Sequence, residues 1–447
     1  MAGRILVDLS PLRQSRDFRL LFVGQLIGTL GSQLTVVAIP FQVFELTRSS
    51  LQVGAVSIVQ LGPLIVGAMV GGTVGDAVDR RTLLLVSTAV LALTSGALAL
   101  NSLLDHPSLV VLYVVSAVAA GLTGAATTAR NAAVPAMVDR RLLSAAYAFM
   151  QIILQVGAVG GPAVAGVLIG AIHIQSAYVI DAVTYAVTLG TVLAMSPIPP
   201  APGASRPGLR SIADGLAYLR GRQQLQGVYL IDINAMVFGM PRALFPALAL
   251  DVFHGGATTL GWLYAAPGAG ALVGAVTTGW VGRMRRHAWA IIAAVVAWGA
   301  AVTAFGFVRA LAPALVLLAV AGWADVISAV LRNTVLQLSI PESFRSRLSA
   351  VQMSVVQGGP RLGDLESGTV ASAFGAEISI VSGGLACIAG AVVLAVARPG
   401  FRRFGLSAAE IDAASELDVE TELAELAEDA SPVAVELPPR HDGHTGR

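Results

Sequence analysis

The sequence contains few charged residues, a single cysteine and no lysine. Charged residues make up 12% of the 447 positions, hydrophobic residues make up 55%, and the mean hydropathy is +0.76. A soluble domain cannot bury this much apolar surface, which excludes an ordinary globular protein. The only cysteine is Cys387, so an intrachain disulfide is excluded as well. The formal net charge of +1 gives no sign of a nucleic-acid partner, and we expect none.

Several catalytic and metal-binding motifs are also absent from the sequence. There is no Walker-type phosphate loop, so we expect that ATP does not drive this chain directly. No HExxH motif, paired cysteines or clustered histidines indicate a metal site. No histidine lies at membrane depth, where a Ser/His/Asp hydrolase would need its base. We therefore expect neither an enzyme nor a bound cofactor.

What the sequence has instead is a series of long apolar runs. They contain 18 or more residues each and are separated by short breaks, which is the length that a bilayer core requires. Backbone groups in lipid must pair internally, and the alternating pattern of a barrel is absent, so the runs are helices. We predict an all-α polytopic membrane protein with twelve transmembrane helices. The predicted spans are 18–44, 51–74, 82–101, 108–130, 143–171, 174–195, 225–249, 258–280, 287–307, 311–331, 348–371 and 376–397.

Arginines concentrate in alternate breaks between these runs. One set of breaks holds pairs or clusters such as Arg140/Arg141, whereas the other set holds only Arg48 and Arg309. The positive-inside rule then places both termini in the cytoplasm, and an even number of spans agrees. No cleavable signal is evident, so we expect the first span to stay in the membrane. The predicted parts are a cytoplasmic N-terminus (1–17), a six-helix bundle (18–195), a cytoplasmic linker (196–224), a second six-helix bundle (225–398) and an acidic cytoplasmic tail (399–447).

The linker and the tail differ from the rest of the chain in composition. The linker opens with a proline-rich stretch and continues as an amphipathic pattern from Leu209 to Leu219. We expect a short helix there, lying against the membrane surface. The tail is rich in glutamate and ends in a polar segment, which favours a solvated tail over a docking segment.

The two halves of the chain repeat several short patterns in the same order. The repeated pairs are Arg130-Asn131 with Arg332-Asn333, Gly160-Gly161-Pro162 with Gly358-Gly359-Pro360, and Gly170 with Gly368. Chance matches are common in sequence rich in glycine and alanine, but three in one order favour a duplication. Transporters build a central site between two such halves.

The break after the second span combines glycine, acid and arginine. Its four marked residues are Gly72, Asp76, Arg80 and Arg81. The alternative is an ordinary basic turn between two membrane spans, which could have the same composition. The spacing also resembles the loop signature of the major facilitator superfamily, although Ala77 stands where a basic residue is usual. Asp79 replaces the family's common glycine, as in the branch that contains enterobactin exporters.

This resemblance implies a major facilitator fold of two pseudo-symmetric six-helix bundles. It also implies that Gly72, Asp76, Arg80 and Arg81 form a latch that joins the halves when the cytoplasmic gate is closed. Arg130 and Arg332 would pair with Asp76 or Asp325 in that state. The alternative for both arginines is an ordinary position near a helix end.

The fifth span carries a second motif. It reads Gly157-x3-Gly161-Pro162-x3-Gly166, in which glycines allow close helix packing and proline interrupts the hydrogen-bond ladder. The pattern resembles the motif that marks exporters in the superfamily, and packing alone is the alternative. The run from Gly359 to Glu366 resembles the sequence found in members of the enterobactin-exporter and multidrug-efflux branch.

Charged residues inside the apolar runs are costly and usually face a cavity or a partner. The candidates for proton coupling or substrate binding are Asp181, Arg242, Asp325, Arg361, Asp364 and Glu366, with Asp232 as a further buried acid. Any of these acids could carry a proton or could belong to a structural salt bridge. Arg361 and Asp364 share a helical face and could neutralise each other, whereas Glu366 points elsewhere.

Polar and aromatic residues nearby extend this set of candidates. The resemblance implies a cavity lined by spans one, four, seven and ten. Gln25, Ser32, Gln33 and Thr35 on the first span do not share one face, and some of them should line it. Tyr178 and Tyr185 flank Asp181 and could stack on a flat substrate, or could simply be packed.

Together these features favour a proton-coupled exporter of amphiphilic small molecules, either drugs or siderophore-like metabolites. We expect a multi-pass monomer in the cell membrane, with a small-molecule substrate, the proton and the lipid bilayer as its partners and the proton gradient as its energy source. An uptake permease of the same fold is the first alternative. A membrane-embedded enzyme or sensor is the second, and the sequence offers neither a catalytic cluster nor a large soluble domain for it.

Overall fold

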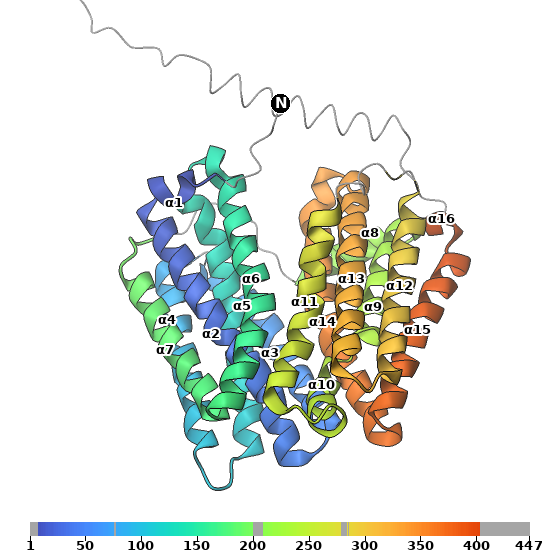
Figure 1. Ribbon diagram of the computed structural model, residues 1–447. Coiled ribbons are helices and arrows are strands. Elements are labelled where there is room, and N and C mark those ends of the chain that lie inside the picture. The colour runs from blue at the N-terminus through green and yellow to red at the C-terminus, as the bar shows by residue number, and fades with distance from the viewer. Residues whose placement is uncertain (1–7, 76, 200–208, 279–283, 285, 403–447) are drawn as a thin grey trace, which may run out of the picture.

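The computed structural model describes residues 8–75, 77–199, 209–278, 284 and 286–402, and the regular elements in these ranges are helices. The helices form two bundles that stand side by side (Figure 1). The N-terminal bundle contains α1 (Ser10–Gln14), α2 (Arg16–Thr47), α3 (Ser50–Gly75), α4 (Arg80–Ser102), α5 (Leu109–Met137), the 3-10 turn η1 (Arg140–Leu142), α6 (Leu143–Ala171) and α7 (Ile174–Leu193). After α8 (Leu209–Leu219), the C-terminal bundle contains α9 (Gln223–Phe238), η2 (Arg242–Leu244), α10 (Phe245–Ala247), η3 (Leu248–Val252), α11 (Gly256–Thr277), α12 (His287–Phe307), α13 (Leu311–Ser339), α14 (Glu342–Phe374), α15 (Ala376–Ala397) and α16 (Pro399–Arg402).

The predicted spans correspond to long helices of this structure. Within the described residues, eleven helical segments are long and apolar enough to cross a membrane. The remaining predicted span, 348–371, lies in α14, which has 33 residues but carries the charges of Arg361, Asp364 and Glu366. This helix packs against α3 and α9, so protein covers much of its polar surface.

The seventh span differs from the prediction, because its helix is interrupted. A continuous helix was expected over 225–249, but α9 ends at Phe238 and a 3-10 turn follows at Arg242. Pro241 has no N–H to continue the helical ladder. Trp298 instead donates its Nε1–H to the carbonyl oxygen of Gly239, at 2.9 Å. The interruption places Arg242 on an irregular turn rather than in the middle of a helix.

The two bundles touch through two helix pairs that the internal repeat relates, α6 with α11 and α3 with α14. A Cβ on Gly166 of α6 would lie 2.7 Å from the carbonyl oxygen of Ala257 and from the Cα of Gly261. A Cβ on Gly368 of α14 would lie 2.5 Å from the carbonyl oxygen of Ser50. Glycine is therefore what allows the bundles to pack backbone to backbone.

These contacts lie toward one end of the molecule. We call the end that holds α1, α8 and α16 the linker end, and the other, near α10, the opposite end (Figure 1). The helices of the two bundles approach each other near α10 and diverge toward the linker end. A salt bridge between Arg48 and Asp251, at 3.4 Å, adds a surface contact at the opposite end. In this conformation the bundles are joined at the opposite end.

The predicted linker helix is confirmed as α8, Leu209–Leu219. It packs on the linker end of α14, where Tyr218 stacks on Phe344 with ring centroids 4.1 Å apart. Asp214 pairs with Arg347 at 3.9 Å. Part of the face that we expected on the membrane surface is thus covered by protein. The acidic tail beyond Arg402 lies outside the described residues.

Candidate functional site

A cavity of about 520 Å³ lies mainly inside the N-terminal bundle. Its walls come from α2, α3, α4, α5, α6 and α7, and residues of η2, α11 and α14 close it from the C-terminal bundle. The expected contributions of spans one, four and seven are confirmed. Span ten, α13, contributes none of the lining residues. Its Arg332 instead forms a salt bridge with Asp232 of α9 inside the C-terminal bundle.

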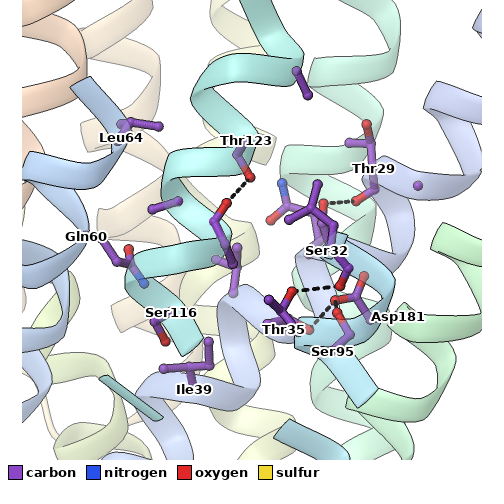
Figure 2. A pocket seen from close by; sticks show the side chains of 18 of the residues that line it. Thr29, Ser32, Thr35, Ile39, Gln60, Leu64, Ser95, Ser116, Thr123 and Asp181 are labelled. Atoms are coloured by element: carbon purple, nitrogen blue, oxygen red, sulfur yellow. Dashed lines mark hydrogen bonds between the residues drawn. The ribbon is translucent and has the colours of Figure 1, made fainter. Parts of the chain in front are cut away.

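The cavity wall is rich in hydroxyl and amide groups (Figure 2). All four polar residues singled out on the first span line it, namely Gln25, Ser32, Gln33 and Thr35. The facing helices add Gln60, Ser95, Ser116 and Thr123. Sequence reasoning missed these four, although Thr88 and Ser95 recur at a helical spacing of seven in an otherwise apolar span. Such a wall offers many hydrogen-bonding groups to a ligand.

Asp181 of α7 forms the centre of one polar cluster (Figure 2). Its Oδ2 accepts hydrogen bonds from the hydroxyls of Thr35, at 2.6 Å, and Ser95, at 2.8 Å. The residue is 1% exposed, and its Oδ1 is buried without a hydrogen-bond partner among the described residues. No arginine of the described ranges lies within salt-bridge distance of it. Asp181 is therefore a buried acid held by hydroxyls from two other helices.

The two tyrosines beside Asp181 have different surroundings. Tyr185 lines the cavity, where it could contact a flat ligand. Tyr178 is fully buried, and its hydroxyl donates to Gln42 at 2.7 Å. Only Tyr185 thus remains a candidate for stacking on a substrate.

A second cluster lies where the C-terminal bundle closes the cavity. Arg242, Arg361 and Asp364 all line it, which confirms that Arg361 and Asp364 share a face. Asp364 and Arg361 interact electrostatically, as expected, but no salt bridge within 4.0 Å joins these two described residues. Asp364 instead accepts a hydrogen bond from the hydroxyl of Ser57 on α3, at 2.7 Å, and Arg361 donates to the carbonyl oxygen of Gln357. The Ser57–Asp364 bond therefore links the two bundles.

Arg332 has two acidic partners inside the C-terminal bundle. Its Nη2 lies 2.9 Å from Asp232 and 3.8 Å from Asp325, and both Arg332 and Asp232 are almost fully buried. The Arg332–Asp325 pair was expected only when the cytoplasmic gate closes. It exists here within one helix, α13, because residues seven apart share a helical face. This pair therefore does not depend on contact between the bundles.

Arg130, the counterpart of Arg332 in the first half, has neutral partners. Its guanidinium donates to the side-chain oxygen of Gln25 and to the hydroxyl of Thr127. It lines the cavity. No carboxylate of the described residues lies within salt-bridge distance of it. The two repeated arginines thus occupy electrostatically different sites.

The loop that resembles the family signature lies between α3 and α4. Arg80 donates to the carbonyl oxygen of Ala132, and Arg81 donates to those of Val192 and Leu193. Both arginines therefore bind main-chain groups of their own bundle in this conformation. Gly72 lies in the last turns of α3, and Asp76 lies outside the described residues, so the latch stays a prediction.

The glycines of the span-five motif lie on two faces of α6, which continues through Pro162 as one helix. A Cβ on Gly157 or Gly161 would meet side chains of α2 at 2.5 Å and 2.3 Å, within the same bundle. Gly166 instead faces α11 across the interface, and Thr258 donates to its carbonyl oxygen at 3.4 Å. The motif thus joins close packing inside one bundle to contact between bundles.

Two of the remaining candidates lie away from the cavity. Asp325 and Glu366 are not among its lining residues. The position of Glu366 agrees with the expectation that it points away from Asp364. Four of the six sequence candidates, Asp181, Arg242, Arg361 and Asp364, are therefore gathered around one space.

Comparison with known sequences finds a family and curated relatives that match most of this chain. A family model described as a transmembrane secretion effector matches residues 7–438. The enterobactin exporter EntS of Escherichia coli O1:K1 / APEC is 28% identical over 399 residues, covering 89% of this chain and 96% of the relative. EntS of Citrobacter koseri is 30% identical over 346 residues, covering 77% of this chain and 83% of the relative.

Solved structures resemble the fold at low sequence identity. The nucleoside transporter NupG has a TM-score of 0.69 at 14% identity, covering 87% of this chain and 100% of that chain. A POT family transporter in complex with 5-aminolevulinic acid has a TM-score of 0.70 at 10% identity, covering 87% and 97%. These likenesses show the same arrangement of membrane helices.

Proposed function

Because the chain belongs to the transmembrane secretion effector family of the major facilitator superfamily, we propose that it exports a siderophore-like small molecule by alternating access. The chain is a multi-pass membrane transporter rather than an enzyme. The two relatives compared above match this chain over most of their length, and both are named as enterobactin exporters. These names support outward transport and a siderophore-like substrate.

The observation that carries this proposal is the cavity, which lies mainly inside the N-terminal bundle and is closed by residues of the C-terminal bundle. Its wall combines hydroxyl and amide groups with apolar surface, which suits an amphiphilic molecule with several hydrogen-bonding groups. The linker end is rich in arginine, which supports a cytoplasmic position for this end and for both termini. In that orientation the cavity is closed toward the outside by the α6–α11 and α3–α14 contacts.

The transport cycle follows from these contacts. The substrate enters from the cytoplasm while the linker end is open and binds in the cavity. The bundles then close at the linker end and separate at the opposite end, where the Ser57–Asp364 and Arg48–Asp251 contacts break. Release to the outside and the reverse motion complete the cycle.

We propose that Asp181 is the group that couples this cycle to the proton gradient. Taking up a proton at Asp181 breaks no ion pair, because its partners are the hydroxyls of Thr35 and Ser95. A proton on Asp232 or Asp325 would instead remove the negative charge that Arg332 binds. Asp181 also lines the cavity, so a change in its charge affects the substrate site directly.

The direct test is enterobactin flux in inverted membrane vesicles from cells that produce the chain. An exporter accumulates enterobactin inside such vesicles, and dissipation of the pH gradient with nigericin should stop the accumulation. Accumulation only in right-side-out vesicles would identify an uptake permease. Accumulation that nigericin leaves unchanged would rule out proton coupling.

The role of Asp181 is tested with Asp181→Asn, which keeps the size of the side chain and removes the exchangeable charge. We expect enterobactin flux to lose its dependence on the pH gradient. Glu366→Gln is the matched control, because Glu366 lies in a membrane helix but does not line the cavity. Normal coupling in Asp181→Asn would assign the proton to another acid.

A further inference from the structure

Three arginines line the cavity without a salt bridge to a carboxylate among the described residues. They are Arg130, Arg242 and Arg361, and no acid among the described residues lies within 4.0 Å of their guanidinium nitrogens. Other arginines of the structure do have such partners, including the exposed Arg309 and the buried Arg332. A charge at membrane depth without a partner is costly, so it indicates a binding role.

The internal repeat shows what has changed at Arg130. In the second half, Arg332 of α13 is bound by Asp232 of α9. In the first half, Arg130 of α5 is bound by Gln25 of α2, which occupies the corresponding place on the first helix of its bundle. An amide thus replaces a carboxylate, and the charge of Arg130 is left uncompensated beside the cavity.

The cluster at the other side of the cavity also carries excess positive charge. Asp364 interacts electrostatically with Arg242 and Arg361, but its hydrogen bond goes to Ser57. One carboxylate therefore faces two guanidinium groups. The Nε of Arg361 is buried without a hydrogen-bond partner among the described residues, so the protein does not satisfy all the donors of this guanidinium group.

The remaining lining residues do not restore neutrality. Asp181 is the other lining acid, and it is engaged by hydroxyls rather than by an arginine. The lining thus holds three arginines against two aspartates, and other polar groups of the wall are uncharged. Electrostatic forces are stronger in such a partly buried site than in water. The wall should attract anions and repel cations.

We infer that the transported molecule carries at least one acidic group, which Arg130 or the Arg242–Arg361 pair binds. The guanidinium groups have donors suited to a carboxylate or to an ionised phenol-type oxygen. Arg130 belongs to the N-terminal bundle, and Arg242 and Arg361 belong to the C-terminal bundle. An anionic substrate that contacts both sides therefore draws the bundles together and favours closure. This inference rests on the proposed transport function.

The first experiment compares two dyes that share a xanthene ring system and differ in charge. Fluorescein is an anion and rhodamine 123 is a cation at pH 7.5. Binding of each dye to the purified full-length chain in nanodiscs is measured by fluorescence anisotropy. We expect fluorescein to bind at least tenfold more tightly. Equal binding of both dyes, tighter binding of rhodamine 123, or no binding of fluorescein would overturn the inference.

The second experiment assigns the charge to named residues. Arg361→Gln and Arg130→Gln should each weaken fluorescein binding about tenfold, the effect of losing one charge-assisted hydrogen bond. Arg361→Lys should restore part of the affinity, because the charge is retained. Arg309→Gln, an exposed arginine outside the cavity, should change nothing. Unchanged fluorescein affinity in both cavity variants would overturn the assignment.

The two proposals fail in different ways. If enterobactin flux runs in the wrong direction while fluorescein binding still depends on Arg361, the export function fails and the anion site stands. If enterobactin is exported but charge has no effect on dye binding, the anion site fails and the export function stands. The dye comparison in the unchanged chain remains decisive even if a variant does not fold.

Discussion

The contact between α6 and α11 should set the balance between the two conformations of the transporter. We consider the substitution Gly166→Ala. The added Cβ would lie 2.7 Å from the Cα of Gly261, 2.9 Å from its nitrogen and 2.7 Å from the carbonyl oxygen of Ala257. All three atoms belong to the main chain, so no side chain can rotate away. The helices must separate for the methyl group to fit.

The magnitude follows from the cost of overpacking a tight contact. Adding a methyl group without room typically costs about 1–3 kcal/mol. In the proposed cycle this contact is made only while the opposite end is closed, so the cost applies to that conformation alone. A differential cost of this size shifts a two-state equilibrium by about 5- to 150-fold. We therefore expect Gly166→Ala to favour the conformation that is open at the opposite end.

Gly160→Ala provides the matched control on the same helix, because a Cβ there has no atom within 4 Å. Spin labels would be attached to His106→Cys and Ala310→Cys, one in each bundle at the opposite end. Double electron–electron resonance would then measure the distance between the two labels. Native Cys387 is buried and should not react. We expect a longer distance population in Gly166→Ala only. Identical distance distributions in both variants would refute the reasoning.

Two further substitutions address the charged groups. Arg332→Gln leaves Asp232 and Asp325 without their shared cation, so it should lower the stability by about 3–5 kcal/mol. A thermal unfolding assay in detergent checks this against Arg309→Gln, whose exposed pair should contribute at most about 1 kcal/mol, and equal melting temperatures would contradict the buried pair. Asp76→Asn should abolish enterobactin flux in vesicles without changing the melting temperature, if the loop serves as a latch; normal flux would leave the loop with only a topological role.

The number and position of the membrane helices could be predicted because the bilayer imposes a length on every apolar run. The helices His287–Phe307 and Ala376–Ala397 begin and end at the predicted residues. Even α14 was identified in spite of its charges, because its neighbouring breaks were clear. Such boundaries depend on local sequence alone.

The break in the seventh span could have been found from the same kind of signal. Gly239 and Pro241 lie two residues apart, and both disfavour a continuous helix. Prolines are nevertheless tolerated inside several other helices of this structure, including Pro40 of α2 and Pro162 of α6. The outcome depends on whether a donor such as the Nε1–H of Trp298 is placed to bind a carbonyl oxygen at the break.

The position of the cavity could not be predicted, because it depends on how whole helices rotate against one another. The helical phase separated Glu366 from Asp364 correctly, but it gave no reason to place Asp181 beside Thr35 and Ser95. These three residues come from α7, α2 and α4, and only tertiary packing brings them together. The same holds for the exclusion of α13 from the cavity wall.

The polar character of α14 has a consequence for the assembly of the protein during synthesis. A helix with an internal arginine and two acids inserts poorly into lipid on its own. Its two main neighbours, α3 and α9, precede it in the chain and are already made when it leaves the ribosome. The order of the helices thus lets the late, charged helix α14 insert against protein that is already in the membrane rather than against lipid alone.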